Sequence, residues 1–263
     1  MFKTSELFGE LASETRLTIL LMLEDKPRRL KDLANKLGLT VQEVHRNISR
    51  LLDASLIAKN SDGEFELTEY GLLIVKQIPY FRFLSNNKQL FIKHTLNYLP
   101  EKFVQRIGAL TDARVYHSLP VVLEKIKMLE SNARKSLKLL IGQVWYEEGV
   151  ILADKINNNV EVTILLREGI IFPKEIIESD MIKSIEELTT RDNFNTRMVE
   201  RNGAALYINE EEAAVIFPEK NGEFDMSHIL ISNNKIFYEW CLDLFNHYLQ
   251  NSKPYMPDKI KIV

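Results

Sequence analysis

The sequence has few of the residue types that cross-link small domains or cradle cofactors. Its 263 residues include one cysteine, Cys241, which excludes an intrachain disulfide framework and a cysteine-rich zinc site. Ten glycines leave little material for phosphate-binding loops, and no P-loop, Gly-x-Gly-x-x-Gly or Gly-x-Ser-x-Gly motif is present. No apolar run reaches the roughly 18 residues that cross a bilayer, and the first residues lack the apolar segment of a secretory signal. We therefore expect a protein of the reducing cytoplasm without a membrane partner.

Neither sign of charge is in large excess over the whole chain. The 34 Lys and Arg residues and 37 Asp and Glu residues give a formal net charge of -3, whereas proteins that bind phosphate backbones usually carry an excess of basic residues. The basic residues are concentrated, however. Residues 26–59 hold eight basic and three acidic side chains, a local net charge of +5, and residues 85–263 carry a net charge of -3. A basic run is usually a solvated face, so its meaning depends on the structure that it forms.

The basic segment lies within a pattern of three short helices. Ser13 is typical of a helix N-cap, and Pro27 ends that first helix. A second helix has apolar residues at i, i+3, i+4 and i+7 from Leu30, and Gly38 ends it because glycine adopts the left-handed C-cap conformation at little cost. Thr40 then caps a third helix. Two short helices joined by a three-residue turn predict a helix-turn-helix.

A hairpin is expected directly after the third helix. Residues 56–59 and 64–67 have the composition of short strands, and the segment between them, residues 60–63, contains an Asp-Gly turn signal. The order helix, helix, helix, hairpin is that of a winged helix-turn-helix. The stretches LASETRLTILLML, LKDLANKLGLTVQEVHRNISRLLDASLI and FELTEYG resemble winged-helix repressors of the ArsR-like type. The resemblance implies a DNA-binding domain over residues 1–84.

The third helix has an apolar and a polar face. Its apolar residues are Val41, Val44, Ile48, Leu51 and Leu52. An α-helix fits the major groove of DNA, and its outward side chains must offer hydrogen-bond donors and acceptors to base edges. Gln42 suits adenine and Arg46 suits guanine, while Lys59 on the hairpin can reach the backbone or minor groove. The residues predicted to contact DNA are Thr40, Gln42, Glu43, His45, Arg46, Ser49, Arg50 and Lys59.

The polar face has two other interpretations. It can be ordinary exposed surface, and some winged helices mediate only protein contacts. Glu43 would repel phosphate unless it accepts a hydrogen bond from cytosine. The constellation as a whole nevertheless favours DNA binding, because its polar residues recur at i, i+3, i+4, i+7 and i+8 on one face.

Beyond residue 84 the pattern changes from helical to alternating. Residues 85–114 are expected to form a helical connector that can also serve in dimerisation. From residue 115 strands alternate with helices, which is typical of an α/β layer around a partly parallel sheet. The expected strands are 136–141, 160–167, 196–200, 204–209, 213–217 and 227–231, and the expected helices are 117–135, 147–157, 173–187 and 234–250. The predicted architecture is α+β or α/β: an N-terminal winged helix-turn-helix, a helical connector, and a C-terminal mixed α/β sheet domain over residues 115–263.

Two longer stretches resemble one group of regulators. The sequence FIKHTLNYLPEKFVQRIGAL is similar to the connector, and NGEFDMSHILISNNKIFYEWCLDLFNHYL to the closing signature, of archaeal transcriptional regulators that pair a winged helix with the methanogenesis-regulatory-protein middle domain. The resemblance extends over roughly residues 5–255. It implies control of transcription in response to a ligand or signal, and it leaves the signal unidentified.

Catalytic and metal-binding interpretations find little support in the sequence. The α/β domain resembles phospholipase-D-like sheets, but their chemistry needs His-x-Lys, which is absent here. Cys241 falls on the apolar side of the last helix, so we expect a core residue there. His94 and His117 have no partner at ligand spacing and are expected to be surface or hydrogen-bonded core histidines. No catalytic residue, metal or cofactor is therefore predicted.

A ligand site in the second domain is expected at the carboxyl ends of its strands. Polar and aromatic residues follow or end those strands and suit a small polar or anionic effector. These residues are Trp145, Tyr146, Arg167, Tyr207 and Asn209. Core packing and a structural ion pair are the alternative explanation for each of them.

The sequence as a whole predicts a sequence-specific DNA-binding transcriptional regulator. We expect a homodimer on a pseudo-palindromic double-stranded operator, with the second domain as the signal-sensing part. The alternatives are a protein-interaction module that does not bind DNA and an enzyme with an unrecognised site in the α/β domain.

Overall fold

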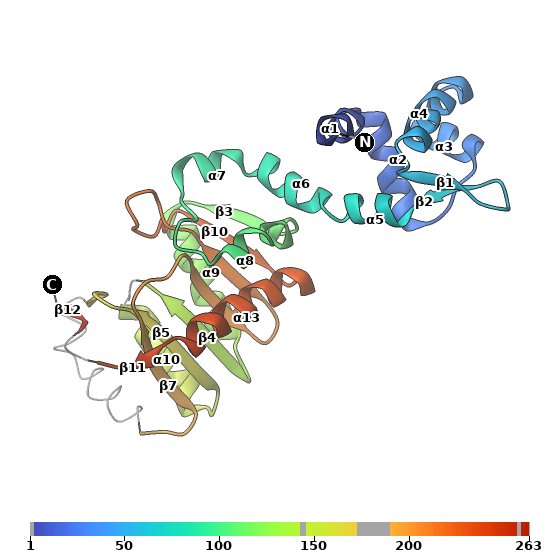
Figure 1. The fold of residues 1–263 in the computed structure, drawn as a ribbon. Coiled ribbons are helices and arrows are strands. Elements are labelled where there is room, and N and C mark those ends of the chain that lie inside the picture. The colour runs from blue at the N-terminus through green and yellow to red at the C-terminus, as the bar shows by residue number, and fades with distance from the viewer. Residues whose placement is uncertain (1–2, 143–145, 173–189, 257–258, 263) are drawn as a thin grey trace. The chain divides into compact units, whose positions relative to one another are not determined.

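The chain forms two compact units, Met1–Pro79 and Tyr80–Val263 (Figure 1). The computed structural model describes residues 3–142, 146–172, 190–256 and 259–262. The boundary between the units falls inside helix α6, which extends over Ile78–Asn86. Among the described residues, no helix is both long enough and apolar enough to cross a membrane.

Unit 1 has the winged helix-turn-helix order that the sequence predicts. Its elements are α1 (Thr4–Leu11), α2 (Glu14–Asp25), α3 (Leu30–Leu37), α4 (Val41–Asp53), β1 (Ile57–Lys59), β2 (Phe65–Leu67) and α5 (Glu69–Val75). Ser13 caps α2 by accepting from the backbone N–H of Arg16. Gly38 ends α3 at φ 66°. The strands β1 and β2 pair antiparallel with Ile57 opposite Leu67, which confirms the predicted hairpin.

The core of unit 1 lies between α2, α3, α4 and the hairpin. Ile19, Leu33, Val44 and Ile48 are buried there. Two residues assigned to the apolar face of the third helix, Val41 and Leu52, are instead exposed. Leu51, next to Leu52, is fully buried, as is Val44, so Val41 and Leu52 lie at the margin of the buried stripe and the stripe is narrower than the apolar periodicity suggests. Helix α1 was not predicted from the sequence pattern.

Helix α5 approaches the rest of unit 1 closely at one glycine. A Cβ atom added to Gly71 would lie 1.9 Å from the carbonyl oxygen of Leu56. The hydroxyl of Thr68 holds this junction, because it caps α5 at the N–H of Gly71 and donates to the carbonyl oxygen of Ser55. Glycine is required at this position by the space available, and not by a positive φ.

Unit 2 is built on one eight-stranded sheet with the strand order β11-β7-β5-β4-β8-β9-β10-β3. The strands are β3 (Arg114–His117), β4 (Ser136–Ile141), β5 (Glu161–Arg167), β7 (Phe194–Val199), β8 (Ala205–Asn209), β9 (Ala213–Ile216), β10 (His228–Ser232) and β11 (Lys253–Pro254). Strands β4, β5 and β7 are parallel, and the other neighbours pair antiparallel. The predicted mixed sheet is therefore confirmed. The edge strands β3 and β11 were not foreseen.

Helices cover both faces of this sheet (Figure 1). Helix α13 (Lys235–Gln250) packs on one face, and α9 (Leu119–Asn132) and α10 (Tyr146–Asn157) pack on the other. On the α13 side, Trp240 and Cys241 are fully buried, as the sequence analysis expected for the cysteine. Burial raises the pKa of the Cys241 thiol well above its ordinary value, so the thiol is un-ionised.

Residues 85–114 contribute to the core of unit 2 beneath α13. They include α7 (Lys88–Lys93), α8 (Glu101–Val104) and a short 3-10 helix, η1 (Ile107–Leu110). Phe103 and Ile107 are fully buried, and the indole N–H of Trp240 donates to the carbonyl oxygen of Phe103 at 3.2 Å. The expected connector thus has its own buried anchors on the sheet domain.

The last elements form a small parallel pair, β6 (Ile171–Phe172) with β12 (Lys261–Ile262). The helix expected over residues 173–187 lies outside the described residues.

Candidate nucleic-acid interface

The N-terminal end of α4 is held by a reciprocal cap. The Thr40 hydroxyl oxygen accepts from the N–H of Glu43 at 3.3 Å, and the Glu43 carboxylate accepts from the N–H of Thr40 at 2.9 Å. The Thr40 hydroxyl also donates to this carboxylate at 2.7 Å. These hydrogen bonds lower the pKa of Glu43, and the one from the Thr40 hydroxyl has the largest effect. Glu43 is thus occupied in starting the helix, which explains an acidic residue on a predicted DNA-binding face.

In the middle of helix α4, the buried and the exposed residues lie on opposite faces, as the sequence predicts. Val44, Ile48 and Leu51 are buried. Of the residues predicted to contact DNA, six are exposed and two, Glu43 and Ser49, are half-buried. The exposed ones are Thr40, Gln42, His45, Arg46, Arg50 and Lys59. At about 1.5 Å per residue, the 13 residues of α4 give a rod of roughly 20 Å, long enough to follow a major groove.

The two arginines of this face differ in their partners. The Arg50 guanidinium donates to both carboxylate oxygens of Glu10, at 2.5 and 3.1 Å. Arg16 contacts the same carboxylate at 2.9 Å. Within the part of the chain that the structure describes, no hydrogen bond or ion pair engages the side chain of Arg46. Arg46 is therefore free to bind a new partner, while Arg50 must first share or release Glu10.

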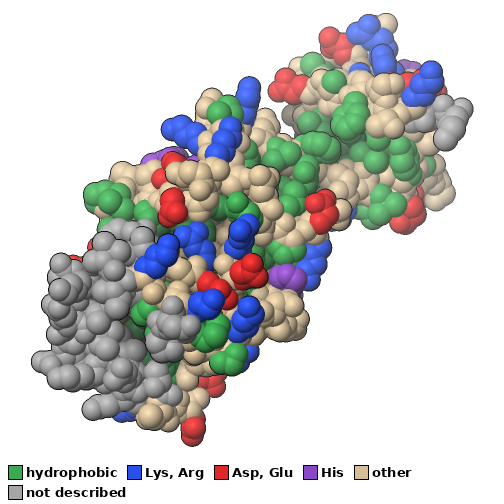
Figure 2. Space-filling view, turned by 60° about the vertical axis from the view of Figure 1, so that its left-hand side comes forward, with side chains coloured by type: hydrophobic (Ala, Val, Ile, Leu, Met, Phe, Trp, Pro, Cys, Tyr) green, Lys and Arg blue, Asp and Glu red, His purple; other side chains and the backbone are tan. Residues whose placement is uncertain are grey.

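The hairpin presents Lys59 beside a tight and partly acidic turn. The side-chain oxygen of Asn60 accepts from the N–H groups of Asp62 and Glu64, and Gly63 completes the turn at φ 78°. Lys59 is exposed at the end of β1. The carboxylates of Asp62 and Glu64 lie on the same hairpin, so its tip is not a basic surface. Figure 2 shows the mixture of Lys, Arg, Asp and Glu side chains on the visible side of unit 1, together with a group of hydrophobic side chains.

Two family models match the chain, one in each unit. Residues 8–86 match the HVO_A0261 N-terminal domain, and residues 149–251 match the middle domain of the methanogenesis regulatory protein FilR1. The chain belongs to the archaeal winged-helix regulators that carry the FilR1 middle domain. The match to the middle domain of a regulatory protein identifies it as a transcription regulator.

The solved structures that match the chain share little sequence with it, and their TM-scores are low. TrmBL2, an archaeal chromatin protein described with a novel mode of DNA binding, is 10% identical, with 96% of this chain and 100% of that chain covered and a TM-score of 0.44. NucT from Helicobacter pylori is 11% identical, with 55% and 99% covered and a TM-score of 0.41. An IclR-family regulator from Rhodococcus is 13% identical, with 91% and 92% covered and a TM-score of 0.21. No curated protein matches the chain.

Three of the residues predicted to bind an effector lie in described strands of unit 2, Arg167 in β5 and Tyr207 and Asn209 in β8. Tyr207 is buried in β8, and the side chain of Asn209 donates to the carbonyl oxygen of Leu129 and accepts from the N–H groups of the following turn. Arg167, at the end of β5, donates to the carbonyl oxygen of Gly222 at 3.2 Å. Trp145 and the side chain of Tyr146 lie outside the described residues. In these positions Tyr207, Asn209 and Arg167 have structural partners.

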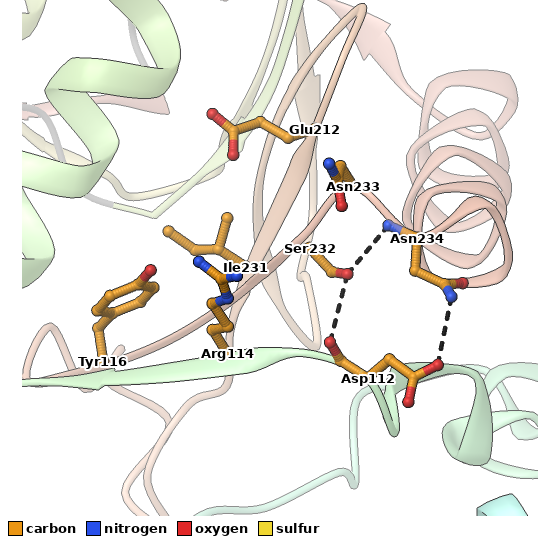
Figure 3. A pocket seen from close by; sticks show the side chains of 8 residues that line it. All are labelled: Asp112, Arg114, Tyr116, Glu212, Ile231, Ser232, Asn233 and Asn234. Atoms are coloured by element: carbon orange, nitrogen blue, oxygen red, sulfur yellow. Dashed lines mark hydrogen bonds between the residues drawn. The ribbon is translucent and has the colours of Figure 1, made fainter.

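A cavity of about 400 Å3 lies at the β3 edge of the sheet of unit 2 (Figure 3). Its walls come from β3, the end of β10 and the start of α13, and its lining residues are Asp112, Arg114, Tyr116, Glu212, Ile231, Ser232, Asn233 and Asn234. The side chain of Asn234 donates to the carboxylate of Asp112 at 3.2 Å. Its lining is thus mixed in charge, with one guanidinium and two carboxylates. No local sequence pattern indicates this cavity, because its lining residues come from two distant segments, residues 112–116 and 212–234.

Proposed function

We propose that this regulator binds double-stranded DNA in a sequence-specific manner through α4, as a homodimer, and that unit 2 tunes this binding in response to a small ligand. We further infer that it acts in the cytoplasm. The observation that carries the proposal is the exposed face of α4, with Gln42, His45 and Arg46 on a helix whose opposite side is packed in the core of unit 1. A capped, rigidly mounted helix with free donors is what major-groove recognition requires.

We assign each proposed DNA contact to a base or to a phosphate, with regard to the hydrogen-bond partners that the side chain has in the free protein. Arg46 and Gln42 are the proposed base readers, because bidentate pairing to guanine and adenine needs side chains without competing partners. Thr40, Ser49, Arg50 and Lys59 are proposed to contact phosphates, and His45 either a base or a phosphate. Glu43 supports the others as the cap of α4. This division limits base recognition to the first half of the helix.

Exposed apolar side chains on α5 support the homodimer. Leu73 is 64% exposed and Tyr70 is 40% exposed, and both lie on the helix that follows the hairpin. Large exposed apolar groups on one short helix are typical of a surface that a partner covers. Two copies joined there would present two α4 helices, which match half-sites about 34 Å apart on a pseudo-palindrome.

The cavity beside β3 supports the ligand response. Its volume of about 400 Å3 suits a small molecule. Arg114 favours a polar or anionic effector, and the carboxylates of Asp112 and Glu212 favour one that also carries hydrogen-bond donors. The residues predicted from the sequence, Arg167 among them, remain a second proposed location.

The test is fluorescence anisotropy of the full chain on labelled duplex DNA from upstream of its own gene. Arg46→Ala is expected to weaken specific binding by about 5- to 150-fold, the range for loss of one bidentate base contact of 1–3 kcal/mol. The matched control is Arg134→Ala, which removes an exposed arginine from unit 2 and should leave affinity unchanged. Equal, salt-insensitive affinities for wild type and Arg46→Ala would contradict DNA binding through α4.

A protein-interaction role is the second candidate, and a specific observation favours it. Val41 is 45% exposed and Leu52 is 37% exposed near the two ends of α4, where a protein partner could cover them. If α4 binds a protein, Leu52→Ser should weaken that complex while Arg46→Ala leaves it largely intact. The opposite pattern is expected for DNA.

A further inference from the structure

Two histidines and an aspartate from distant segments meet at the edge of unit 2. His94 follows α7 as its C-cap residue, Asp225 lies in the turn before β10, and His228 is the first residue of β10. The Asp225 Oδ2 atom is 2.8 Å from His94 Nε2 and 2.7 Å from His228 Nδ1. The side chain of His94 is 1% exposed, that of Asp225 11% and that of His228 26%. The cluster is therefore enclosed on the His94 side and open on the His228 side.

The proton on His94 is assigned by its other contact. His94 Nδ1 lies 2.7 Å from the carbonyl oxygen of Leu90. A carbonyl oxygen can only accept, so Nδ1 carries the hydrogen, and in the neutral ring Nε2 bears a lone pair. That lone pair faces the Asp225 carboxylate oxygen at 2.8 Å. Two acceptors at this distance repel one another unless a proton or a cation stands between them.

Asp225 is held in the orientation that a ligand needs. Its Oδ1 atom accepts from the Ser227 hydroxyl at 2.5 Å and from the Ser227 N–H at 2.9 Å. These bonds occupy Oδ1 and leave Oδ2 directed at the two imidazoles. Metal-binding histidines usually donate their second N–H to a backbone carbonyl, and metal-binding carboxylates are usually hydrogen-bonded in turn. The Leu90 carbonyl and Ser227 fill both of these supporting roles.

We propose that His94 Nε2, Asp225 Oδ2 and His228 Nδ1 form a binding site for a divalent transition-metal ion of the zinc class. The three ligand atoms lie within 4.8 Å of one another. Two ligands of a tetrahedral zinc ion, at bonds of about 2.0–2.1 Å, are roughly 3.3 Å apart, so the 2.7 and 2.8 Å contacts need open by only some tenths of an ångström.

The donor set selects the class of ion. Two imidazole nitrogens and one carboxylate oxygen suit zinc, cobalt or nickel, whereas magnesium and calcium require mainly oxygen ligands. Three protein ligands leave a fourth position for water or for a further side chain. His117 lies opposite His228 on β3, with the two ring centroids 4.9 Å apart, and is the adjacent side chain with a suitable donor.

The test measures metal binding by the full chain after treatment with a chelator. Calorimetry measures the binding of Zn2+, and visible absorption measures the binding of Co2+. We expect one ion per chain, cobalt d–d bands of a low-coordinate nitrogen and oxygen site, and a melting temperature that rises with Zn2+ and falls again with chelator. His228→Gln should weaken the affinity by more than about 100-fold, because even outer-shell partners contribute 10- to 100-fold. Ser227→Ala should fall within that outer-shell range.

His247→Gln is the matched control, since it removes a partly exposed histidine of unit 2 from outside the cluster and should bind Zn2+ like the wild type. His228 is the position of choice for the loss of a ligand, because it is the most exposed of the three and its variant can be checked for folding by circular dichroism without metal. Absence of saturable Zn2+ binding in the wild type would overturn the site. Equal affinity of a folded His228→Gln variant and the wild type would also overturn it.

Discussion

Arg50 and Glu10 lie forty positions apart in the chain and form a two-point ion pair at the edge of the proposed DNA-binding face. Glu10 is mostly buried, with a side chain 12% exposed, and Arg16 contacts it as well. Arg50 is 59% exposed. The Glu10 carboxylate therefore connects α1 and α2 to α4. It would also compete with DNA phosphates for the Arg50 guanidinium.

Acid should weaken unit 1 through Glu10. The hydrogen bond from Arg50, with the charges of Arg16 and Arg50, lowers the pKa of Glu10 below its ordinary value of 4.5. A depressed folded-state pKa gives stability that is present above 4.5 and is lost as the pH falls through the lower value. Glu10→Gln should therefore melt below the wild type at pH 7, and the gap should narrow below pH 4.5. Melting curves at several pH values measure this, and a gap independent of pH would contradict it.

The two arginines of α4 should separate stability from DNA affinity. Arg46→Ala is expected to leave the free energy of unfolding within about 0.5 kcal/mol of the wild type, as for most surface substitutions, while reducing DNA affinity. Arg50→Ala should lower the melting temperature too, because it removes one partner of the Glu10 carboxylate. Each loss of a phosphate contact should reduce the slope of log affinity against log salt by about 0.9. An unchanged slope for Arg50→Ala would show that Arg50 stays with Glu10 in the complex.

A buried carboxyl pair in unit 2 predicts the opposite pH dependence. Glu130 on α9 is 1% exposed, and burial first, then the charge and hydrogen bond of Glu148, raise its pKa well above 4.5. A raised pKa favours the protonated carboxyl in the folded state, so stability falls as the pH rises from 4.5 through the folded-state value, by up to about 1.4 kcal/mol per pH unit. The substitution Glu130→Gln keeps the shape of the side chain and removes its ionisable carboxyl group.

Melting curves between pH 5 and pH 9 provide the measurement. The melting temperature of Glu130→Gln relative to the wild type should rise with pH. Glu124→Gln, an exposed position on the same helix, should show no such trend. If the difference in melting temperature between Glu130→Gln and the wild type did not change with pH, Glu130 would not be the group that titrates.

The close approach at Gly71 predicts a loss of stability on adding one methyl group. Gly71→Ala would place Cβ 1.9 Å from the carbonyl oxygen of Leu56, so α5 or the backbone just before β1 must move, at about 1–3 kcal/mol. Gly9→Ala is the control. Gly9 lies in α1 with no atom within 4 Å of an added Cβ, and alanine should stabilise that helix by up to about 1 kcal/mol. Urea unfolding of both variants checks the contrast.

Most of unit 1 could be predicted because its signals are local. Thr40 and Glu43 are three positions apart, and Gly38 acts on the turn in which it sits. The pairing of Arg50 with Glu10 could not be predicted, since nothing in the spacing of α4 shows that Glu10 of α1 lies beside it. Val41 and Leu52 fit the apolar periodicity of the third helix and are nevertheless exposed, because periodicity indicates a face and not how wide a stripe of that face becomes buried.

The same division holds in unit 2. The runs at 136–141 and 160–167 are rich in Leu, Ile and Val, so their strands could be predicted from composition, and they pair in parallel as β4 and β5. Strand β3 has no such run and is a strand because β10 offers it an edge. His94 was expected to be a hydrogen-bonded core or surface histidine, and it is buried with hydrogen-bond partners. That Asp225 and His228 are beside it depends on a turn 131 positions later.

The amino-acid sequence by itself determined the helix caps, the hairpin turn, the central strands and the polar face of α4, because each depends on residues within about one turn or one strand of each other. Only the tertiary structure decided which charged side chains form ion pairs, that a cavity lies beside β3, and which histidines contact Asp225. Those outcomes depend on contacts between segments brought together by core packing, and core packing is set by the whole chain at once.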